Sequence, residues 1–189
     1  MMKKAIFGIL AISMYGPIVA HAYTPNTANT EVSTKIKVTV PDAVITAEVK
    51  AQYLLTPALK SASISVETKD GIVTLKGTID TNLQYDKAVS IAESINGVKD
   101  VTADDLYVTS SEAPIHDLYI TAKVKGTLMK ERFFGPKPVE YWPVYIETKN
   151  SSVYLAGTVE TAEKRDAIVD VVKSVQGVHA VESLITIQQ

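Results

Sequence analysis

The chain has 189 residues, with 19 basic and 21 acidic side chains, a formal net charge of −2 and no cysteine. This balance argues against a protein that binds nucleic acid through a strongly basic surface. The absence of cysteine excludes disulfides, thiolate metal sites and a lipid-modified cysteine within this chain.

The first 22 residues are typical of a secretory signal peptide. Lys3 and Lys4 precede an uncharged run, and the small-x-small sequence Ala-His-Ala ends at Ala22. The uninterrupted apolar run covers 16 residues, which is short for a membrane span of roughly 20. We therefore expect cleavage after Ala22 and export of the remaining chain. Residues 23–39 are rich in Thr and Asn, so we expect a flexible arm, of which residues 35–40 alternate enough to form an edge strand.

The rest of the chain contains two copies of one sequence pattern. The sequence VETKDGIVTLKGTIDT (66–81) aligns with IETKNSSVYLAGTVET (146–161) at an offset of 80. Upstream, residues 45–54 align with residues 120–129 at an offset of 75. The second copy has therefore gained five residues between these blocks, and the segment RFFGPKPVEYWP (132–143) lies in this enlarged gap.

Each copy begins with a predicted helix followed by two strands. Asp42 and Asp117 can cap these helices, whose apolar residues recur every four positions. These residues are Ile45, Val49 and Tyr53 in one copy, and Ile120, Val124 and Leu128 in the other. In the first copy strands are predicted on either side of a turn at residues 69–71, and in the second copy the turn lies at Asn150-Ser151.

A second helix and a last strand complete each copy. Thr81 with Gln84 predicts a capping box, whereas Thr161 is followed by Lys164 and keeps only the threonine cap. Gly97 and the matching Gly177 are expected to end these helices in a left-handed conformation, and strands follow at residues 101–108 and 181–187. Gly77 and Gly157 precede the threonine caps, where they allow either a close approach of the strand to a helix or the approach of a ligand.

We therefore predict an α+β fold of two tandem α-β-β-α-β units. In each unit a three-stranded sheet has one apolar face, which two helices cover. A unit of about 70 residues buries a marginal core by itself, so docking of the two units would stabilise both.

Two short motifs in each unit resemble the BON family. The first is a strand with a Gly-Thr end, VTLKGT (73–78) and VYLAGT (153–158). The second is the Gly-Val-x-x-Val sequence that follows the Ala- or Val-rich helix, at residues 97–101 and 177–181. The resemblance covers residues 40–188 and predicts a first BON domain at 40–109, a linker at 110–115 and a second BON domain at 116–189.

The resemblance implies a periplasmic protein of the envelope or osmotic-stress type, whose domains contact phospholipid or protein surfaces. Without a cysteine for lipid attachment, the chain looks similar to the soluble, osmotically inducible members, which are associated with chaperone-like behaviour, and not to the outer-membrane lipoproteins. The family has no general catalytic residues to transfer.

Catalytic and metal-binding patterns are absent from the sequence. His116 and His179 belong to different elements and are better explained as solvated or capping residues, and Asp104-Asp105 is expected to face water. No phosphate-binding loop, H-E-x-x-H or G-x-S-x-G motif is present. We therefore expect neither an enzyme nor a protein with a cofactor or metal.

A cluster of basic and aromatic residues in the second unit is the candidate contact site. Between positions 123 and 137 five cations face one acid, although the chain as a whole is acidic. Basic residues favour anionic bilayer surfaces, and amphipathic aromatic rings favour the interface. The candidate residues are Lys123, Lys125, Lys130, Arg132, Phe133, Phe134, Lys137, Tyr141 and Trp142.

A structural role is the alternative for the same residues. Phe133 or Phe134 would close the second core, Trp142 would pack at the junction of the units, and the prolines would stiffen a long loop. The functional hypothesis is reversible contact of the second domain with anionic phospholipid. The alternative function is a chaperone-like or scaffold protein that holds envelope polypeptides with the same aromatic residues.

Overall fold

The computed structural model describes residues 39–110 and 115–188. The expected signal peptide and nearly all of the expected arm lie outside the described residues, as does most of the expected linker. Among the described residues, no helix combines the length and the apolar character that a membrane span requires.

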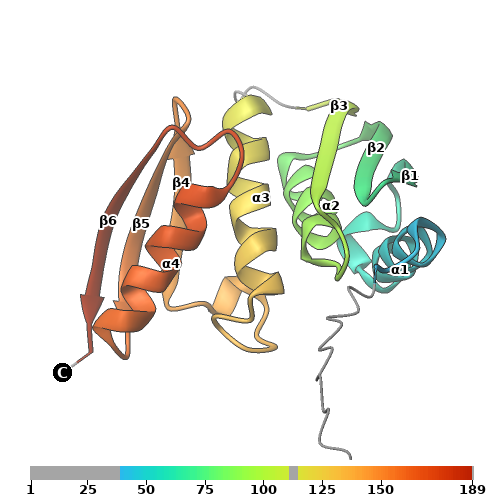
Figure 1. Cartoon of the computed structure of the whole chain (residues 1–189). Helices are drawn as coiled ribbons and strands as arrows, with labels where there is room; N and C mark the ends of the chain where they lie inside the picture. The colour runs from blue at the N-terminus through green and yellow to red at the C-terminus, as the bar shows by residue number, and fades with distance from the viewer. Residues whose placement is uncertain (1–38, 111–114, 189) are drawn as a thin grey trace, which may run out of the picture. The chain divides into compact units, whose positions relative to one another are not determined.

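The order of elements in each unit is helix, strand, strand, helix, strand, as predicted (Figure 1). The first unit contains α1 (Asp42–Leu55), a 3-10 turn η1 (Pro57–Leu59), β1 (Ser63–Lys69), β2 (Ile72–Ile79), α2 (Asn82–Ser94) and β3 (Asp100–Val108). The second contains α3 (Ile115–Lys130), a 3-10 turn η2 (Val139–Tyr141), β4 (Val144–Lys149), β5 (Ser152–Val159), α4 (Ala162–Ser174) and β6 (Ala180–Ile187).

Each unit has a three-stranded mixed sheet, so the predicted α+β fold is confirmed. The strand orders are β1-β2-β3 and β4-β5-β6. In each sheet the first two strands pair antiparallel through a tight hairpin, and the last strand pairs parallel with the middle one. The parallel strand requires a crossover, which α2 and α4 provide.

The caps of α2 and α4 follow the sequence. The Thr81 side chain accepts a hydrogen bond from the Gln84 amide at 3.2 Å, and the Gln84 side chain accepts one from the Thr81 amide at 3.3 Å. This is the predicted capping box. Thr161 accepts from the Lys164 amide at 3.1 Å.

The first helices are held differently from the prediction. Asp42 does not cap α1, whose N-cap is Pro41. Its carboxylate instead accepts hydrogen bonds from the backbone amides of Asp70 and Gly71, at 2.7 and 2.8 Å, in the β1–β2 turn. Both turn residues have positive φ, which directs successive amides toward one acceptor.

The second unit repeats this contact. Asp117 lies within α3 and accepts from the amides of Asn150 and Ser151 at 2.8 and 2.9 Å. The matching aspartates therefore fasten each first helix to the hairpin of its own sheet.

Gly77 and Gly157 serve a close approach between strands. A Cβ at Gly77 would lie 2.0 Å from the Ser63 carbonyl oxygen, and one at Gly157 would lie 2.0 Å from the Pro143 oxygen. Both glycines have positive φ. The neighbouring backbone is therefore that of the first strand, not a helix as expected.

The second helices of the two units, α2 and α4, differ in how many of their residues are buried. In the second unit α4 buries mainly Ile168 and Val172. In the first unit α2 is buried on additional positions, including Tyr85, Val89 and Glu93. The cause is α3, which packs against α2 as well as against its own sheet (Figure 1).

Candidate functional site

The three candidate lysines on α3 are directed toward the first unit. Lys123 is only 3% exposed and forms an ion pair with Asp100. Lys125 pairs with Asp86 at 2.9 Å, and the Lys130 ammonium donates to the Val98 carbonyl oxygen. These interactions cross from α3 to α2, β3 and the turn between them, so two of the three lysines have a carboxylate partner where the units dock.

The helices α2 and α3 cross closely at Gly126. A Cβ at this position would lie 2.5 Å from Glu93 Cβ and 2.6 Å from the Ser90 carbonyl oxygen. The hydroxyl of Tyr119, also on α3, donates to the Val101 carbonyl oxygen, and Ala122 belongs to the core of the first unit. The α2–α3 contact is therefore a packed interface with satisfied polar groups.

Glu93 is the exception within this interface. It is 6% exposed, and its Oε2 atom has no hydrogen-bond partner among the described residues. Burial raises the pKa of Glu93 from 4.5 to about 7, although the positive charges of Lys123 and Lys130 oppose the shift. A carboxyl group at this contact therefore changes its charge near neutral pH.

The aromatic residues of the candidate site anchor the segment between α3 and β4. Phe134 is 7% exposed and contacts Trp142 in a tilted arrangement, with ring centroids 4.6 Å apart and an angle of 38° between the ring planes. Trp142 Nε1 donates to the Lys137 carbonyl oxygen at 3.0 Å, and Phe133 packs partly buried against the second core. These contacts agree with the alternative in which some of the rings are structural.

Three candidate residues remain well exposed on this segment. They are Arg132, Lys137 and Tyr141, and the Tyr141 side chain is 74% exposed. The structure thus separates the nine residues into three lysines at the α2–α3 interface, three partly or fully buried rings and three exposed side chains. Residues 131–143, which carry the last two groups, are called the aromatic loop below.

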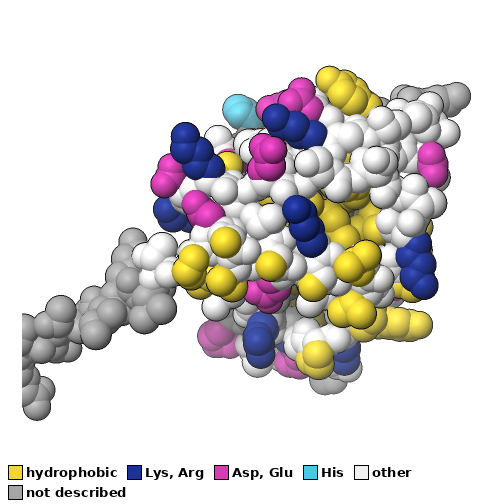
Figure 2. All heavy atoms as spheres, turned by 90° about the vertical axis from the view of Figure 1, so that its right-hand side faces the viewer, with side chains coloured by type: hydrophobic (Ala, Val, Ile, Leu, Met, Phe, Trp, Pro, Cys, Tyr) yellow, Lys and Arg dark blue, Asp and Glu magenta, His cyan; other side chains and the backbone are white. Residues whose placement is uncertain are grey.

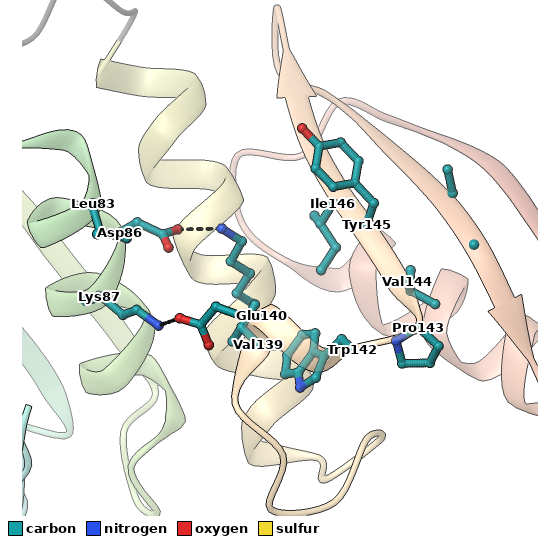
Figure 3. Close-up of a pocket in the computed structure, with 13 residues that line it drawn as sticks. Leu83, Asp86, Lys87, Val139, Glu140, Trp142, Pro143, Val144, Tyr145 and Ile146 are labelled. Carbon is teal, nitrogen blue, oxygen red and sulfur yellow. Dashed lines mark hydrogen bonds and ion pairs between the residues drawn. The ribbon is translucent and has the colours of Figure 1, made fainter.

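A groove lies between the aromatic loop, β4 and α2 (Figure 3). Its volume is about 470 Å³. The apolar walls are formed by Leu83, Val139, Trp142, Pro143, Val144 and Tyr145. Two ion pairs, Lys87–Glu140 and Lys125–Asp86, cross it from α2 (Figure 3).

The sequence did not predict the α2 wall of this groove. Leu83 and Lys87 belong to the first unit, and only docking brings them beside β4. One signal was available: α3 carries Gly126 where the matching position of α1 is Ala51. A glycine within a helix allows another helix to approach closely.

The two candidate histidines, His116 and His179, do not line this groove. His116 and His179 are both exposed. Within residues 39–110 and 115–188 no group of three potential ligand side chains is arranged to hold a metal ion.

The sequence profile of the BON domain matches residues 41–109 and 116–189. The chain belongs to the BON family. The predicted resemblance is therefore confirmed, and because the BON family is non-catalytic, so is the prediction that this chain is not an enzyme.

Two relatives and one solved structure are similar to this tandem BON chain. Osmotically-inducible protein Y of Escherichia coli K12 is 31% identical over 147 residues, which are 75% of this chain and 70% of the relative. A protein of Anaplasma centrale, described as an uncharacterized protein in the gshII 5' region, is 30% identical over 67% of this chain and 83% of its own. The C-terminal domain of CdsD, a structural protein of the type III secretion system of Chlamydia trachomatis, matches at 16% identity and a TM-score of 0.32, over 79% of this chain and 68% of its own.

Proposed function

We propose that this chain is a non-catalytic, osmotically inducible envelope protein of the periplasm, exported by residues 1–22, that contacts anionic phospholipid through its second BON domain. Membership in the BON family and 31% identity to the osmotically inducible relative support the class of function. The contact surface proposed is the exposed part of the aromatic loop, with Arg132, Lys137 and Tyr141.

One observation supports this surface above the others. The rings of Phe134 and Trp142 contact each other within the aromatic loop and hold its two ends together, while two cations and a tyrosine remain exposed on it. Basic residues near an anionic bilayer contribute about 1 kcal/mol each, and an exposed tyrosine suits the polar interface. Lys123, Lys125 and Lys130 are left out of the proposal because the first unit already pairs them. Binding should therefore be weak, reversible and sensitive to salt.

Liposome co-sedimentation tests the proposal. The chain should sediment with phosphatidylglycerol vesicles and not with phosphatidylcholine vesicles, and less at high salt. Reversal of both cations, Arg132→Glu with Lys137→Glu, should weaken binding at least about tenfold, because two attractive contributions become repulsive.

The control carries the same change of charge at another place. Lys69→Glu with Lys149→Glu alters two exposed lysines at the hairpin ends of β1 and β4, away from the aromatic loop. Equal loss of binding in the control and the test variant would contradict the assigned surface. Absence of binding to any anionic vesicle would overturn the proposal.

A second candidate function is favoured by the groove between α2 and β4. Within the described residues β4 pairs with β5 on one side only, so its other edge is open to an extended polypeptide. The apolar side chains beside this edge suit alternate side chains of such a segment. This arrangement supports the alternative of a chaperone-like protein that holds unfolded envelope polypeptides.

The fluorescence of the single tryptophan can report peptide binding in the groove. Trp142 lines the groove, so bound peptide should change its fluorescence. The chain should also suppress aggregation of an unfolded envelope protein, and Leu83→Glu should reduce both effects, whereas Ile72→Glu, at an exposed apolar residue at the start of β2, should not. No suppression of aggregation by the unaltered chain would reject this candidate.

A further inference from the structure

The helix α1 is apolar on two opposite faces. One face carries Ile45, Val49 and Tyr53 and is buried in the core of the first unit. The other face, here called the outer stripe, carries Val44, Leu54 and Leu55, which are 50%, 78% and 75% exposed. Ala47 and Ala51 lie between them at helical spacing and are also exposed. Figure 2 views the side of the molecule that carries α1 and shows hydrophobic side chains gathered in a band across it.

The second unit shows what the same stripe does when it is covered. The residues of α3 that match Val44, Ala47 and Ala51 are Tyr119, Ala122 and Gly126. These three contact α2 or the core of the first unit. The internal repeat therefore identifies the outer stripe as a docking face for the second helix of a BON domain.

The second helix of the other unit, α4, is free at the matching face. Asp86, Val89 and Glu93 of α2 meet α3, and the corresponding residues of α4 are Asp166, Val169 and Lys173. Asp166 and Lys173 are exposed, and Val169 is partly exposed. Among the described residues, the ion pair of Asp166 is with its neighbour Arg165, in an exposed position where it can rearrange.

Charges on the two free faces are complementary. Within the chain Lys125 pairs with Asp86, and the matching residues Lys50 and Asp166 carry the same signs. Lys123 of α3 lies near Glu93 of α2. The matching residues are Glu48 on α1 and Lys173 on α4, so the two charges are exchanged and remain opposite. Docking of α1 on α4 in the geometry of α3 on α2 would therefore bring together two pairs of opposite charge.

We propose that the outer stripe of α1 docks on α4 of a second copy of this chain, head to tail. The contact uses different surfaces on the two copies, so repetition of it leads to a closed ring or an open filament. It is weaker than the internal contact for two reasons. Ala51 replaces Gly126 and keeps the helices further apart, and Asp170 replaces Ser90 at the crossing.

Sedimentation velocity over a concentration series tests the proposal. The weight-average mass of the purified protein should rise with concentration between about 10 μM and 1 mM, the range of weak association. Two variants exchange charges without changing the net charge: Glu48→Lys with Lys50→Glu on α1, and Asp166→Lys with Lys173→Glu on α4. Each should weaken self-association roughly tenfold, because exposed pairs contribute up to about 1 kcal/mol each and repulsion replaces them.

A mixture of the two variants gives the decisive result. The altered α1 of the first variant can bind the altered α4 of the second, because their charges are again opposite. The unaltered α1 of the second variant can bind the unaltered α4 of the first, so the mixture should associate like the original protein. The exchange Lys76→Asp with Asp105→Lys, at an exposed pair on β2 and β3, is the control and should have no effect.

Three outcomes would overturn the proposal. A constant monomer mass up to about 1 mM would do so, as would loss of association in the α1 variant alone, which indicates a symmetric α1–α1 contact. The third outcome is a monomeric original protein together with a Leu54→Lys, Leu55→Lys double variant that no longer binds phosphatidylglycerol vesicles. This result would assign the stripe to a bilayer contact. Far-UV circular dichroism verifies that each variant is folded.

Discussion

Glu93 is a buried carboxyl group whose environment raises its pKa to about 7. Its carboxyl group lies between α2 and α3, with Lys123 and Lys130 on one side and Asp100 nearby. Desolvation disfavours the charged form more than the two lysines favour it, which leaves the pKa at about 7. The docking of the two BON domains has therefore placed a proton-binding group in their interface.

We predict that Glu93 makes the free energy of unfolding fall as the pH rises from about 4.5 to about 7. In this window the folded chain keeps a proton that the unfolded chain has released, so folding binds protons. The loss is complete above the folded pKa and amounts to something on the order of 3 kcal/mol. Urea unfolding at pH 5 and pH 8 should show it as a difference between the original chain and Glu93→Gln, which lacks the titration. Equal pH dependence of the two chains would contradict this account.

At the scale of elements, the contact of Asp42 and Asp117 with the hairpin turns recurs in both domains. Each carboxylate accepts two backbone hydrogen bonds from a turn whose residues have positive φ. Hydrogen bonds to a charged acceptor are stronger than neutral ones. The aspartates therefore orient the first helix and the hairpin of each domain relative to each other.

We predict that Asp117→Ala lowers the free energy of unfolding by about 1–3 kcal/mol, because two turn amides lose their acceptor. Asp42→Ala should have a similar effect through the first hairpin. Asp170→Ala, an exposed residue on α4 with no hydrogen bond among the described residues, is the control and should change stability by less than about 0.5 kcal/mol. Chemical denaturation measures all three, and a loss no larger than the control would remove the structural role assigned to the aspartates.

At the scale of the whole described molecule, the approach of α2 to α3 decides what the chain presents to partners. It pairs Lys123 and Lys125 with carboxylates, directs Lys130 to a backbone carbonyl, forms one wall of the groove and leaves the outer stripe of α1 uncovered. Gly126 permits this approach, since a side chain there would collide with Glu93 and Ser90.

We predict that Gly126→Ala destabilises the chain by about 1–3 kcal/mol, because the added carbon forces the two helices apart. An alanine would otherwise stabilise a helix interior by about 1 kcal/mol relative to glycine. Ala51→Leu, at the matching exposed position of α1, is the control and should be nearly neutral. Denaturation followed by Trp142 fluorescence reports the change, and a Gly126→Ala chain as stable as the original would show that the crossing is not tight.

The sequence by itself determined the repeat, the order of elements, the caps of α2 and α4 and the apolar residues that face each sheet. These features depend on residues within a few positions of one another, and the second copy repeats them. The prediction that Asp42 and Asp117 cap their own helices was wrong. The backbone amides that donate to these carboxylates lie 28 to 34 residues away, in the hairpins.

The tertiary structure alone decided the fate of the candidate site. The partners of Lys123, Lys125 and Lys130 lie 23, 39 and 32 residues earlier in the chain, on a different domain. A local count of charges cannot reveal such pairing, because a lysine has the same sequence signature whether it faces water or a carboxylate. Only the packing of α3 on α2 shows that these lysines hold two BON domains together, and that Arg132, Lys137 and Tyr141 remain exposed.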